Sequence, residues 1–203
     1  MKAYQYAYFL LPLLLWPLTF IVFRSMFVYA MLLSTFALAA FTIYKYKGYI
    51  RWKGGSYLQT ILAGIIFAVA LYLIFYFGYF ASSAMGLKGS VANVYAMLYS
   101  QSNRLLLVVS LAFIGLFEEI YWRGGVQGFA SKTKRFSAFP WVISTAYYTA
   151  VHLSTLNPIL VVAAFVVGLS TSLIANRYGI ISSAISHIIW IEAVVVFLPI
   201  LPA

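Results

Sequence analysis

Long apolar runs alternate with short polar segments along most of this 203-residue chain. A helix that crosses the hydrocarbon core of a bilayer needs about 20 predominantly apolar residues, and seven of the runs predict such helices. They cover residues 4–23, 26–44, 57–80, 105–129, 139–152, 159–175 and 180–198. The first run lacks a small-residue cleavage site, so we expect a retained span rather than a signal peptide. The pattern predicts an all-α fold, a polytopic bundle of about seven transmembrane helices.

The longest polar connection covers residues 81–103, between the third and fourth predicted spans. Tyr95, Met97, Leu98 and Tyr99 within it predict one extra short helix, either amphipathic at the membrane interface or re-entrant. We expect a single membrane domain over residues 1–203. Its first part, residues 1–103, contains three spans and this connection, and residues 104–198 contain the helices with the candidate chemistry.

The composition excludes an ordinary soluble domain. Hydrophobic residues make up 65% of the chain and charged residues 8%, whereas soluble domains average about 25% charged residues. The chain has no cysteine, which excludes disulfides, metal–thiolate sites and a cysteine nucleophile. The basic residues behind its net charge of +10 are scattered over short connections rather than gathered on a polar domain. We therefore expect the lipid bilayer, and no nucleic acid, as a partner.

The basic residues also predict how the chain is oriented. With seven alternating spans, nine of them fall on the side of the N-terminus and three on the other, while Arg123 lies within a span. The nine are Lys2, Lys45, Lys47, Arg51, Lys53, Lys132, Lys134, Arg135 and Arg177, and the three are Arg24, Lys88 and Arg104. Cytoplasmic connections carry the excess of Lys and Arg. This predicts a multi-pass protein of the cell membrane, with its N-terminus in the cytoplasm and its C-terminus outside.

Two of the three acidic residues, Glu118 and Glu119, stand side by side within the fourth apolar run. Carboxylates inside a bilayer are costly and mark ion paths, proton relays or catalytic sites that face a bundle interior. Glu119 and Arg123 are four residues apart with the acid first, an arrangement that favours an ion pair along one helix face. Glu118 points about 100° away from Glu119, and Tyr121 and Trp122 occupy the positions where its partner would stand. We therefore expect Glu118 to be the chemically available carboxylate.

Two histidines lie in later spans at depths similar to that of Glu118. With a rise of about 1.5 Å per residue, Glu118, His152 and His187 lie about 18, 20 and 10–15 Å from the ends of their helices on the N-terminal side of the membrane. The three side chains can therefore meet at one level. A carboxylate and two imidazoles in a protein-lined cavity can activate water, carry its proton and stabilise an oxyanion, which is the chemistry of peptide hydrolysis.

These residues resemble the motifs of a known family. The matching segments are Glu118-Glu119-x-x-x-Arg123-Gly124, the aromatic-x-x-x-His segment from Tyr148 to His152, and Gly168 through Asn176-Arg177-Tyr178-Gly179 to His187. They are similar in kind and order to those of the CAAX prenyl protease and bacteriocin-processing family, and the resemblance extends over residues 105–191. It implies a helical intramembrane glutamate protease of the Ras-converting-enzyme type, acting on a membrane-associated peptide or a lipidated protein tail.

The resemblance also implies a role for each residue of the motifs. Glu118 would be the general base that activates water, and His152 would assist it. His187 would help to bind the oxyanion, while Glu119 and Arg123 would brace the helix.

The chain departs from the family pattern at two positions. Tyr148 stands where phenylalanine is usual, a mild change. Ile191 stands where Asn or Asp is usual, four residues after His187, and isoleucine cannot donate a hydrogen bond. Loss of one oxyanion donor can lower the rate about 10²–10³-fold in a protease, so a backbone N–H, Asn157 or another polar group would have to replace it. Glu192 is the next residue, but its side chain points about 100° away from that of Ile191 around the helix. It is therefore a poor geometric substitute for the missing donor.

Several alternatives accompany the intramembrane endopeptidase. Ile191 favours a catalytically silent relative that binds peptides, as an immunity or scaffold protein would. A proton-coupled transporter would also use intramembrane Glu and His, although no repeated half with a matching broken helix is visible. Two His and one Glu form a known zinc ligand set, but no HExxH helix is present, so we expect no metal and no cofactor. The histidines also have a structural interpretation, as interhelical hydrogen-bonding residues.

Overall fold

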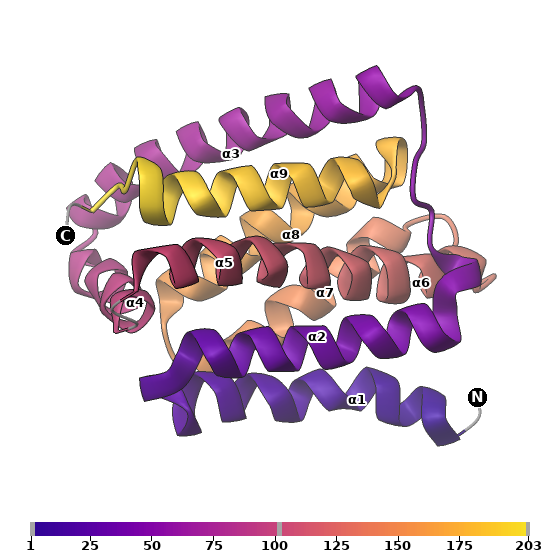
Figure 1. Cartoon of the computed structure of the whole chain (residues 1–203), viewed down its shortest axis with the longest axis horizontal. Helices are drawn as coiled ribbons and strands as arrows, with labels where there is room; N and C mark the ends of the chain where they lie inside the picture. The colour runs from indigo at the N-terminus through magenta and orange to yellow at the C-terminus, as the bar shows by residue number, and fades with distance from the viewer. Residues whose placement is uncertain (1–2, 101–102, 202–203) are drawn as a thin grey trace.

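The computed structural model describes residues 3–100 and 103–201, which fold into a bundle of helices with no β-strand among them (Figure 1). The α-helices are α1 (Ala3–Pro17), α2 (Phe27–Tyr46), α3 (Tyr57–Ala84), α4 (Lys88–Tyr99), α5 (Arg104–Glu119), α6 (Gly128–Lys132), α7 (Pro140–His152), α8 (Pro158–Tyr178) and α9 (Ile180–Glu192). The π-helical segments Leu18–Val22, Ile120–Gln127 and Ala193–Phe197 follow α1, α5 and α9. The shorter 3₁₀ segments are Arg24–Met26, Lys47–Tyr49 and Leu153–Thr155. The all-α prediction is confirmed.

Most of the predicted spans are long enough to cross a membrane. Five apolar helical stretches meet the length and hydropathy of a span, and these are Arg24–Tyr49, Tyr57–Ala84, Arg104–Lys132, Pro158–Tyr178 and Ile180–Phe197. The first predicted span is a shorter apolar helix, Ala7–Val22. Helix α7 has 13 residues and rises about 20 Å, less than the hydrocarbon core of about 30 Å. The polytopic bundle of about seven segments thus contains two that are shorter than the other five, Ala7–Val22 and α7.

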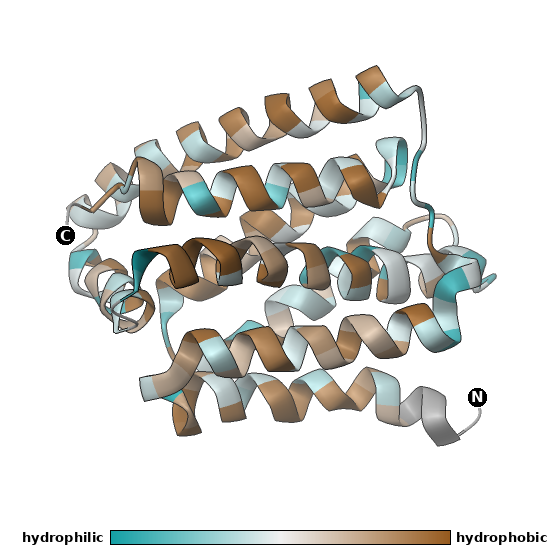
Figure 2. Ribbon diagram, viewed as in Figure 1, coloured by the Kyte–Doolittle hydropathy of each residue, from teal (hydrophilic) through white to brown (hydrophobic). Residues whose placement is uncertain are grey.

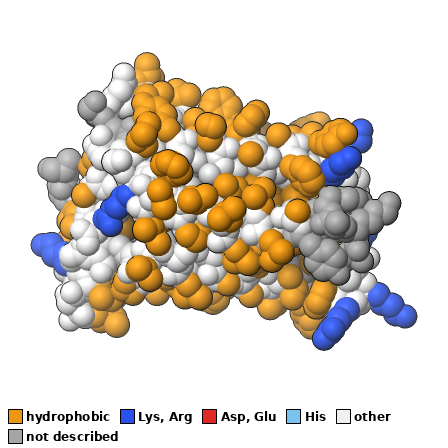
Figure 3. Space-filling view, turned by 90° about the horizontal axis from the view of Figure 1, so that it is seen from below, with side chains coloured by type: hydrophobic (Ala, Val, Ile, Leu, Met, Phe, Trp, Pro, Cys, Tyr) orange, Lys and Arg blue, Asp and Glu red, His pale blue; other side chains and the backbone are white. Residues whose placement is uncertain are grey.

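The surface of the bundle has the distribution of residues that a bilayer requires. Hydrophobic residues dominate the helices, and hydrophilic residues gather mostly at helix ends and in the connections (Figure 2). Seen from the side of α1 and α2, a broad hydrophobic surface separates basic side chains at the two ends (Figure 3). Large apolar side chains are exposed along α2 and α3, including Leu33, Phe36, Ile66 and Phe77. These exposed side chains match a surface that contacts lipid rather than water.

The connections that follow α2 and α8 meet at one end of the bundle. The backbone N–H of Ile180 donates to the carbonyl of Arg51 at 3.0 Å, and that of Gly54 donates to the carbonyl of Tyr178 at 2.8 Å. Gly179 has φ of +86°, and a Cβ there would lie 2.7 Å from the backbone of Lys53, so the turn requires glycine. Spans that alternate in direction place these two connections at the same end, as predicted. Which end faces the cytoplasm stays a prediction, and Lys2 lies outside the described residues.

Helix α4 closes the opposite end. The hydroxyls of Tyr95 and Tyr99 donate to the carbonyls of Val194 and Val195 at 2.6 and 2.5 Å, within the π-helical continuation of α9. The predicted extra helix is therefore present within residues 81–103. Its apolar residues Met97 and Leu98, however, are buried in the bundle. These residues belong to the core rather than to a membrane-facing surface, because the bundle leaves an apolar cavity beneath them.

Helix α5 is central in the bundle and carries the acidic pair into it. It packs between α9 and α2, with α7 and α8 behind it, and α1 and α3 are the outermost helices in this view (Figure 1). Asn103 caps α5 by accepting a hydrogen bond from the N–H of Leu106 at 3.0 Å. Close approach to α9 occurs at Gly115, where a Cβ would lie 3.3 Å from Ile188. The end of α5 is therefore surrounded by protein on all sides.

Candidate functional site

Glu119 takes part in a buried ion pair through one of its two oxygens. Its Oε1 lies 3.2 Å from Nη1 of Arg123, one helical turn away, and both side chains are completely buried. The same oxygen lies 2.9 Å from Nδ1 of His187 on α9. The ion pair predicted from the spacing of four residues is confirmed. It links the fourth and seventh predicted spans through one carboxyl group.

Arg123 is held by three different groups. Besides Glu119, its Nη2 donates to the backbone carbonyl of Gly168 on α8 at 3.2 Å. Its guanidinium lies 4.9 Å from the centre of the Tyr148 ring, a cation–π distance. Gly168 permits this arrangement, because a Cβ there would lie 3.0 Å from the Tyr148 ring. Arg123 thus connects α5, α7 and α8 directly behind the acidic pair.

Glu118 lies beside this ion pair but keeps one oxygen free. Its Oε2 accepts a hydrogen bond from the hydroxyl of Tyr148 at 3.1 Å and lies 3.7 Å from Nε2 of His187. Its Oε1 is buried and has no hydrogen-bond partner among the described residues. A buried carboxylate oxygen without a partner is costly. Oε2 of Glu119 also has no hydrogen-bond partner among the described residues, so Glu118 differs from Glu119 in that it lines the cavity described next.

The residues of this site line one apolar cavity of about 320 Å³. Glu118, Tyr148, His152 and His187 all contribute to its wall. The remaining wall consists mostly of apolar side chains from α2, α3, α4, α5, α8 and α9, among them Met31, Phe75, Val91, Met97, Ile159 and Ile191. The structure thus brings together the three residues that were predicted to meet at one depth. The apolar cavity, called the chamber below, extends from these residues towards α4.

His152 is at the C-terminal end of α7 with both ring nitrogens occupied. Nδ1 lies 2.7 Å from the carbonyl oxygen of Tyr148, one turn back on the helix. Nε2 accepts a hydrogen bond from Nε1 of Trp16 at 3.2 Å. Trp16 lies on α1, is completely buried, and packs edge-on against Trp122. Our sequence reasoning did not find Trp16, because no motif links it to a histidine 136 positions away.

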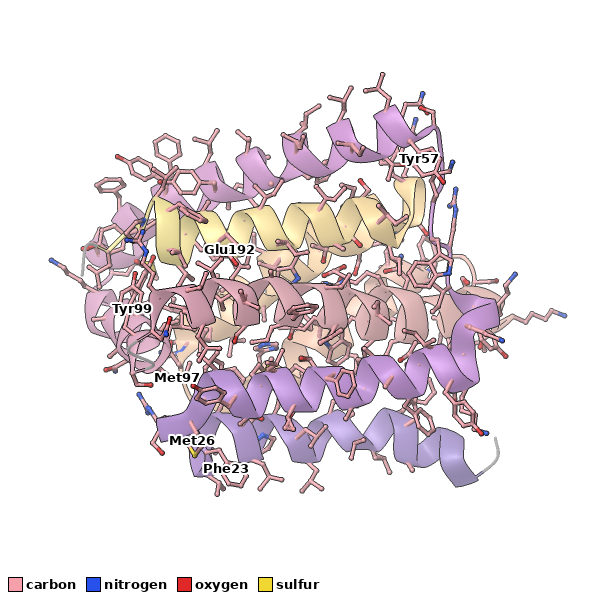
Figure 4. All side chains as sticks on the ribbon, viewed as in Figure 1. Phe23, Met26, Tyr57, Met97, Tyr99 and Glu192 are labelled. Atoms are coloured by element: carbon pink, nitrogen blue, oxygen red, sulfur yellow. The ribbon has the colours of Figure 1, made fainter. Side chains whose placement is uncertain are left out.

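The position of the missing donor, Ile191, and two polar residues near it in sequence or in the motif order, Asn157 and Glu192, lie in different surroundings. Ile191 lines the cavity, as its position one turn after His187 predicts. Asn157 instead caps α8: its Oδ1 accepts hydrogen bonds from the N–H groups of Ile159 and Leu160, and its Nδ2 donates to the carbonyl of Ser90. Glu192 lies between α9 and α5 (Figure 4) and is not among the residues that line the described cavity. The structure therefore brings neither Asn157 nor Glu192 to the cavity wall beside His187.

Trp190 supplies a donor that our sequence reasoning did not identify. It follows His187 by three residues on α9, lines the same cavity, and has its ring centre 5.7 Å from that of His187. Its side chain is 8% exposed, and its indole N–H has no hydrogen-bond partner in the described part of the chain. The signal was present in the sequence, because residues three apart share one face of a helix. Trp190 is thus a buried N–H donor adjacent to the imidazole.

The acidic and histidine residues form a pairwise network rather than a ligand cage. Among residues 3–100 and 103–201, no group of three or more His, Asp or Glu side chains is arranged to hold a metal ion. The contacts of these residues are made instead to Arg123, Tyr148 and Trp16. The arrangement can hold a water molecule at Glu118 and accommodate an apolar group in the chamber beside it.

Fold and site together define an integral membrane protein with a buried acid–histidine centre. Residues 99–191 match the family described as type II CAAX prenyl endopeptidase Rce1-like. This part of the chain is thus similar to the Rce1-like domain of the CAAX prenyl protease and bacteriocin-processing family, and the match supports a CAAX-type intramembrane protease at the level of the family. The resemblance of residues 105–191 is confirmed. No curated protein and no solved structure matches the chain.

Proposed function

We propose that this chain is an intramembrane endopeptidase that hydrolyses a membrane-associated peptide tail with water activated by Glu118. One observation carries the proposal. Oε1 of Glu118 is a buried acceptor without a hydrogen-bond partner among the described residues, and Glu118 lies in the wall of an otherwise apolar cavity. A carboxylate in this position has one favourable partner available to it, a water molecule that donates a hydrogen bond.

The proposed reaction begins with proton transfer from that water to Glu118. The water oxygen adds to the carbonyl carbon of the peptide bond, and the carbonyl oxygen becomes an oxyanion. When the C–N bond breaks, the departing amine takes up the proton held by Glu118. The products are a new carboxylic acid, which then ionises in water, and a free amine, and the enzyme returns to its starting state. Tyr148, which donates to the other oxygen of Glu118, orients the carboxylate for this step.

Two N–H groups border the place where the oxyanion would form. Nδ1 of His187 faces Glu119 at 2.9 Å, so Nε2 is the atom that can face substrate, and it donates when the ring carries both protons. The indole N–H of Trp190 is the second donor, in place of the side chain that Ile191 lacks. Preorganised donors of this kind contribute much of the rate enhancement in acyl-transfer enzymes. Glu119 and Arg123 fix the His187 ring without contacting the peptide.

The apolar chamber suggests what the substrate carries. Pockets for small molecules and cofactors have volumes of about 300–1,000 Å³ and are mostly apolar, and the chamber, at about 320 Å³, falls within this range. Its walls would bury a hydrocarbon chain attached to the peptide, while the scissile bond lies at Glu118. Together with the description of the matching family, this supports a prenylated peptide tail as the substrate.

Ile191 favours one other function, a silent relative that binds such a tail without cutting it. In that case the cavity would bind the lipidated peptide, and the acid–histidine centre would only stabilise the bundle. The two functions differ in one measurable property, which is turnover.

The proposed function is tested with a synthetic peptide that carries a prenylated cysteine four residues from its C-terminus. The purified protein in lipid nanodiscs should release the three terminal residues, and Glu118→Gln should not. A parallel reaction with a chelator tests for metal dependence, and we expect equal turnover with and without it. Binding of the peptide without any cleavage would overturn the protease and favour the silent relative.

A further inference from the structure

The contact between Trp16 and His152 leaves this histidine no nitrogen for catalysis. A backbone carbonyl can only accept a hydrogen bond, so Nδ1, which lies 2.7 Å from the carbonyl oxygen of Tyr148, carries the proton. Nε2 then bears the lone pair, and the indole N–H of Trp16 occupies it at 3.2 Å. Protonation of Nε2 would place two N–H groups against each other. In this arrangement the ring can neither take a proton from water nor donate one to substrate.

We propose that Trp16 is a positioning residue that holds His152 in a resting state, and that substrate entry releases it. The proposal rests on the proposed function, because it concerns the histidine that would assist Glu118. Once the indole N–H withdraws, Nε2 becomes an acceptor in the cavity wall. His152 can then accept a hydrogen bond from the water that Glu118 activates.

Helix α1 is held near its middle and interrupted after Trp16. The hydroxyl of Tyr121 donates to the carbonyl of Tyr8 at 3.0 Å, and the hydroxyl of Tyr147 donates to the carbonyl of Phe9. Beyond these contacts, four leucines are exposed on the outer face, Leu10, Leu11, Leu13 and Leu14. The helix then reaches Pro17, which removes a backbone hydrogen bond, and continues as a π-helix over Leu18–Val22. Such interruptions are where helices bend.

The same part of the chain connects Trp16 to the cavity. Phe20, four residues after Trp16, lines the chamber. Its ring also lies 5.9 Å from the ring of His152 and 4.8 Å from that of Phe27. An apolar chain that fills the chamber as far as this wall would press against Phe20. Because Phe20 follows directly from the interrupted end of α1, its displacement would withdraw Trp16 from His152.

A spectroscopic experiment tests the resting contact without any need for activity. The chain contains two histidines, so ¹⁵N-histidine labelling in nanodiscs gives few imidazole signals, and His152→Gln assigns them. We expect His152 to be protonated at Nδ1, with an Nε2 signal that moves in Trp16→Phe. Trp122→Phe is the matched control, since Trp122 is equally buried in the same aromatic cluster and its indole N–H has no partner among the described residues. Equal spectra for Trp16→Phe and wild type would overturn the proposal.

A second measurement tests release by substrate. The Glu118→Gln variant, which should bind the prenylated peptide without cutting it, is labelled with ¹⁵N-tryptophan, and Trp16→Phe in this background assigns the Trp16 indole signal. Saturating peptide should move this signal and the Nε2 signal of His152 together, while the signal of Trp52, in the exposed connection, stays fixed. A Trp16 signal that does not change when peptide binds would overturn release by substrate.

Kinetics separate a resting contact from a productive one. If Trp16 restrains His152, Trp16→Phe should raise kcat/KM about three- to tenfold. The substitution removes one hydrogen bond from the resting state and so shifts the equilibrium towards the competent state. Trp122→Phe should show no such gain. A fall in kcat/KM specific to Trp16→Phe would mean that the indole orients an active His152, and the resting-state proposal would be wrong. If no variant cleaves peptide, the proposed function fails, and the two spectroscopic experiments still decide the contact.

Discussion

Nε2 of His187 lies 3.7 Å from Oε2 of Glu118, and Nδ1 of the same ring lies 2.9 Å from Oε1 of Glu119. The imidazole thus bridges two carboxyl groups that are neighbours in sequence but differ in their other partners. Glu119 also contacts the guanidinium of Arg123, whereas Glu118 accepts a hydrogen bond from the hydroxyl of Tyr148 and lines the cavity. Under the proposed function, this difference gives Glu119 a structural role and Glu118 the catalytic one.

Glu118→Gln should abolish hydrolysis and leave the fold intact. The amide keeps the shape of the carboxylate but cannot accept a proton from water, and general-base catalysis contributes about 10²–10⁴ in rate. Glu192→Gln is the matched control, because Glu192 is also buried on a helix of the bundle but lies away from the cavity wall. Cleavage of the prenylated peptide is measured for both variants beside wild type. Turnover of Glu118→Gln close to that of wild type would contradict the assignment.

Arg123→Leu should destabilise the fold rather than act on the chemistry directly. It leaves Glu119 as a buried charge with its main partner removed, and breaking a buried pair in this way costs about 3–5 kcal/mol. The thermal midpoint in detergent should fall clearly below that of wild type. Arg135→Leu, which removes an exposed cation from the connection after α6, should leave the midpoint nearly unchanged. An unchanged midpoint for Arg123→Leu would count against the ion pair as a source of stability.

Trp190→Phe should lower kcat while it changes KM little. The ring remains to pack against His187 and Phe75, but the indole N–H is lost as an oxyanion donor. Loss of one such donor lowers kcat by about 10²–10³ in a well-studied protease. Initial rates over a range of peptide concentrations separate the two constants. A rise in KM at constant kcat would show instead that Trp190 contacts the substrate only in the ground state.

Ile191→Asn should restore activity to the Trp190→Phe variant. The new amide lies one helical turn after His187, on the face that lines the cavity, and can donate to the same oxyanion. In the wild-type background the substitution should leave turnover intact or raise it. Ile191→Val is the control that changes size without adding a donor. If Ile191→Asn rescues nothing while the protein stays folded, the oxyanion is not bound at this part of α9.

The sequence predicted the local geometry of the acidic pair and the helical class of the fold. The contact between Glu119 and Arg123 follows from a spacing of four residues on one helix, which requires no knowledge of the neighbouring spans. The shared depth of Glu118 and His187 follows from counting helical rise. Both inferences depend on distances along a single helix. They therefore hold before the packing of the bundle is known.

Contacts between segments that are distant in sequence could not be predicted from distances along a single helix. The hydrogen bond from Trp16 to His152 depends on how α1 packs against α7, and hydrophobic periodicity in a membrane gives little information on which face meets which helix. The π-helical turns after α5 and α9 carry no composition signal either. Asn157 was considered from the sequence as a replacement oxyanion donor, although an Asn followed by Pro is a typical start of a helix. That signal predicts the cap of α8 that the structure shows.

The burial of every acidic and histidine side chain has a consequence for experiments at different pH. The chain has three acidic residues and two histidines, and Glu118, Glu119, Glu192, His152 and His187 are all buried. Lys, Arg and Tyr do not ordinarily titrate between about pH 4 and 8. Apart from the chain termini, the outer surface should therefore keep a constant charge over this range. If the protein cleaves peptide as proposed, a pH–rate profile measured with an uncharged reporter in zwitterionic lipid would report the titration of buried groups alone.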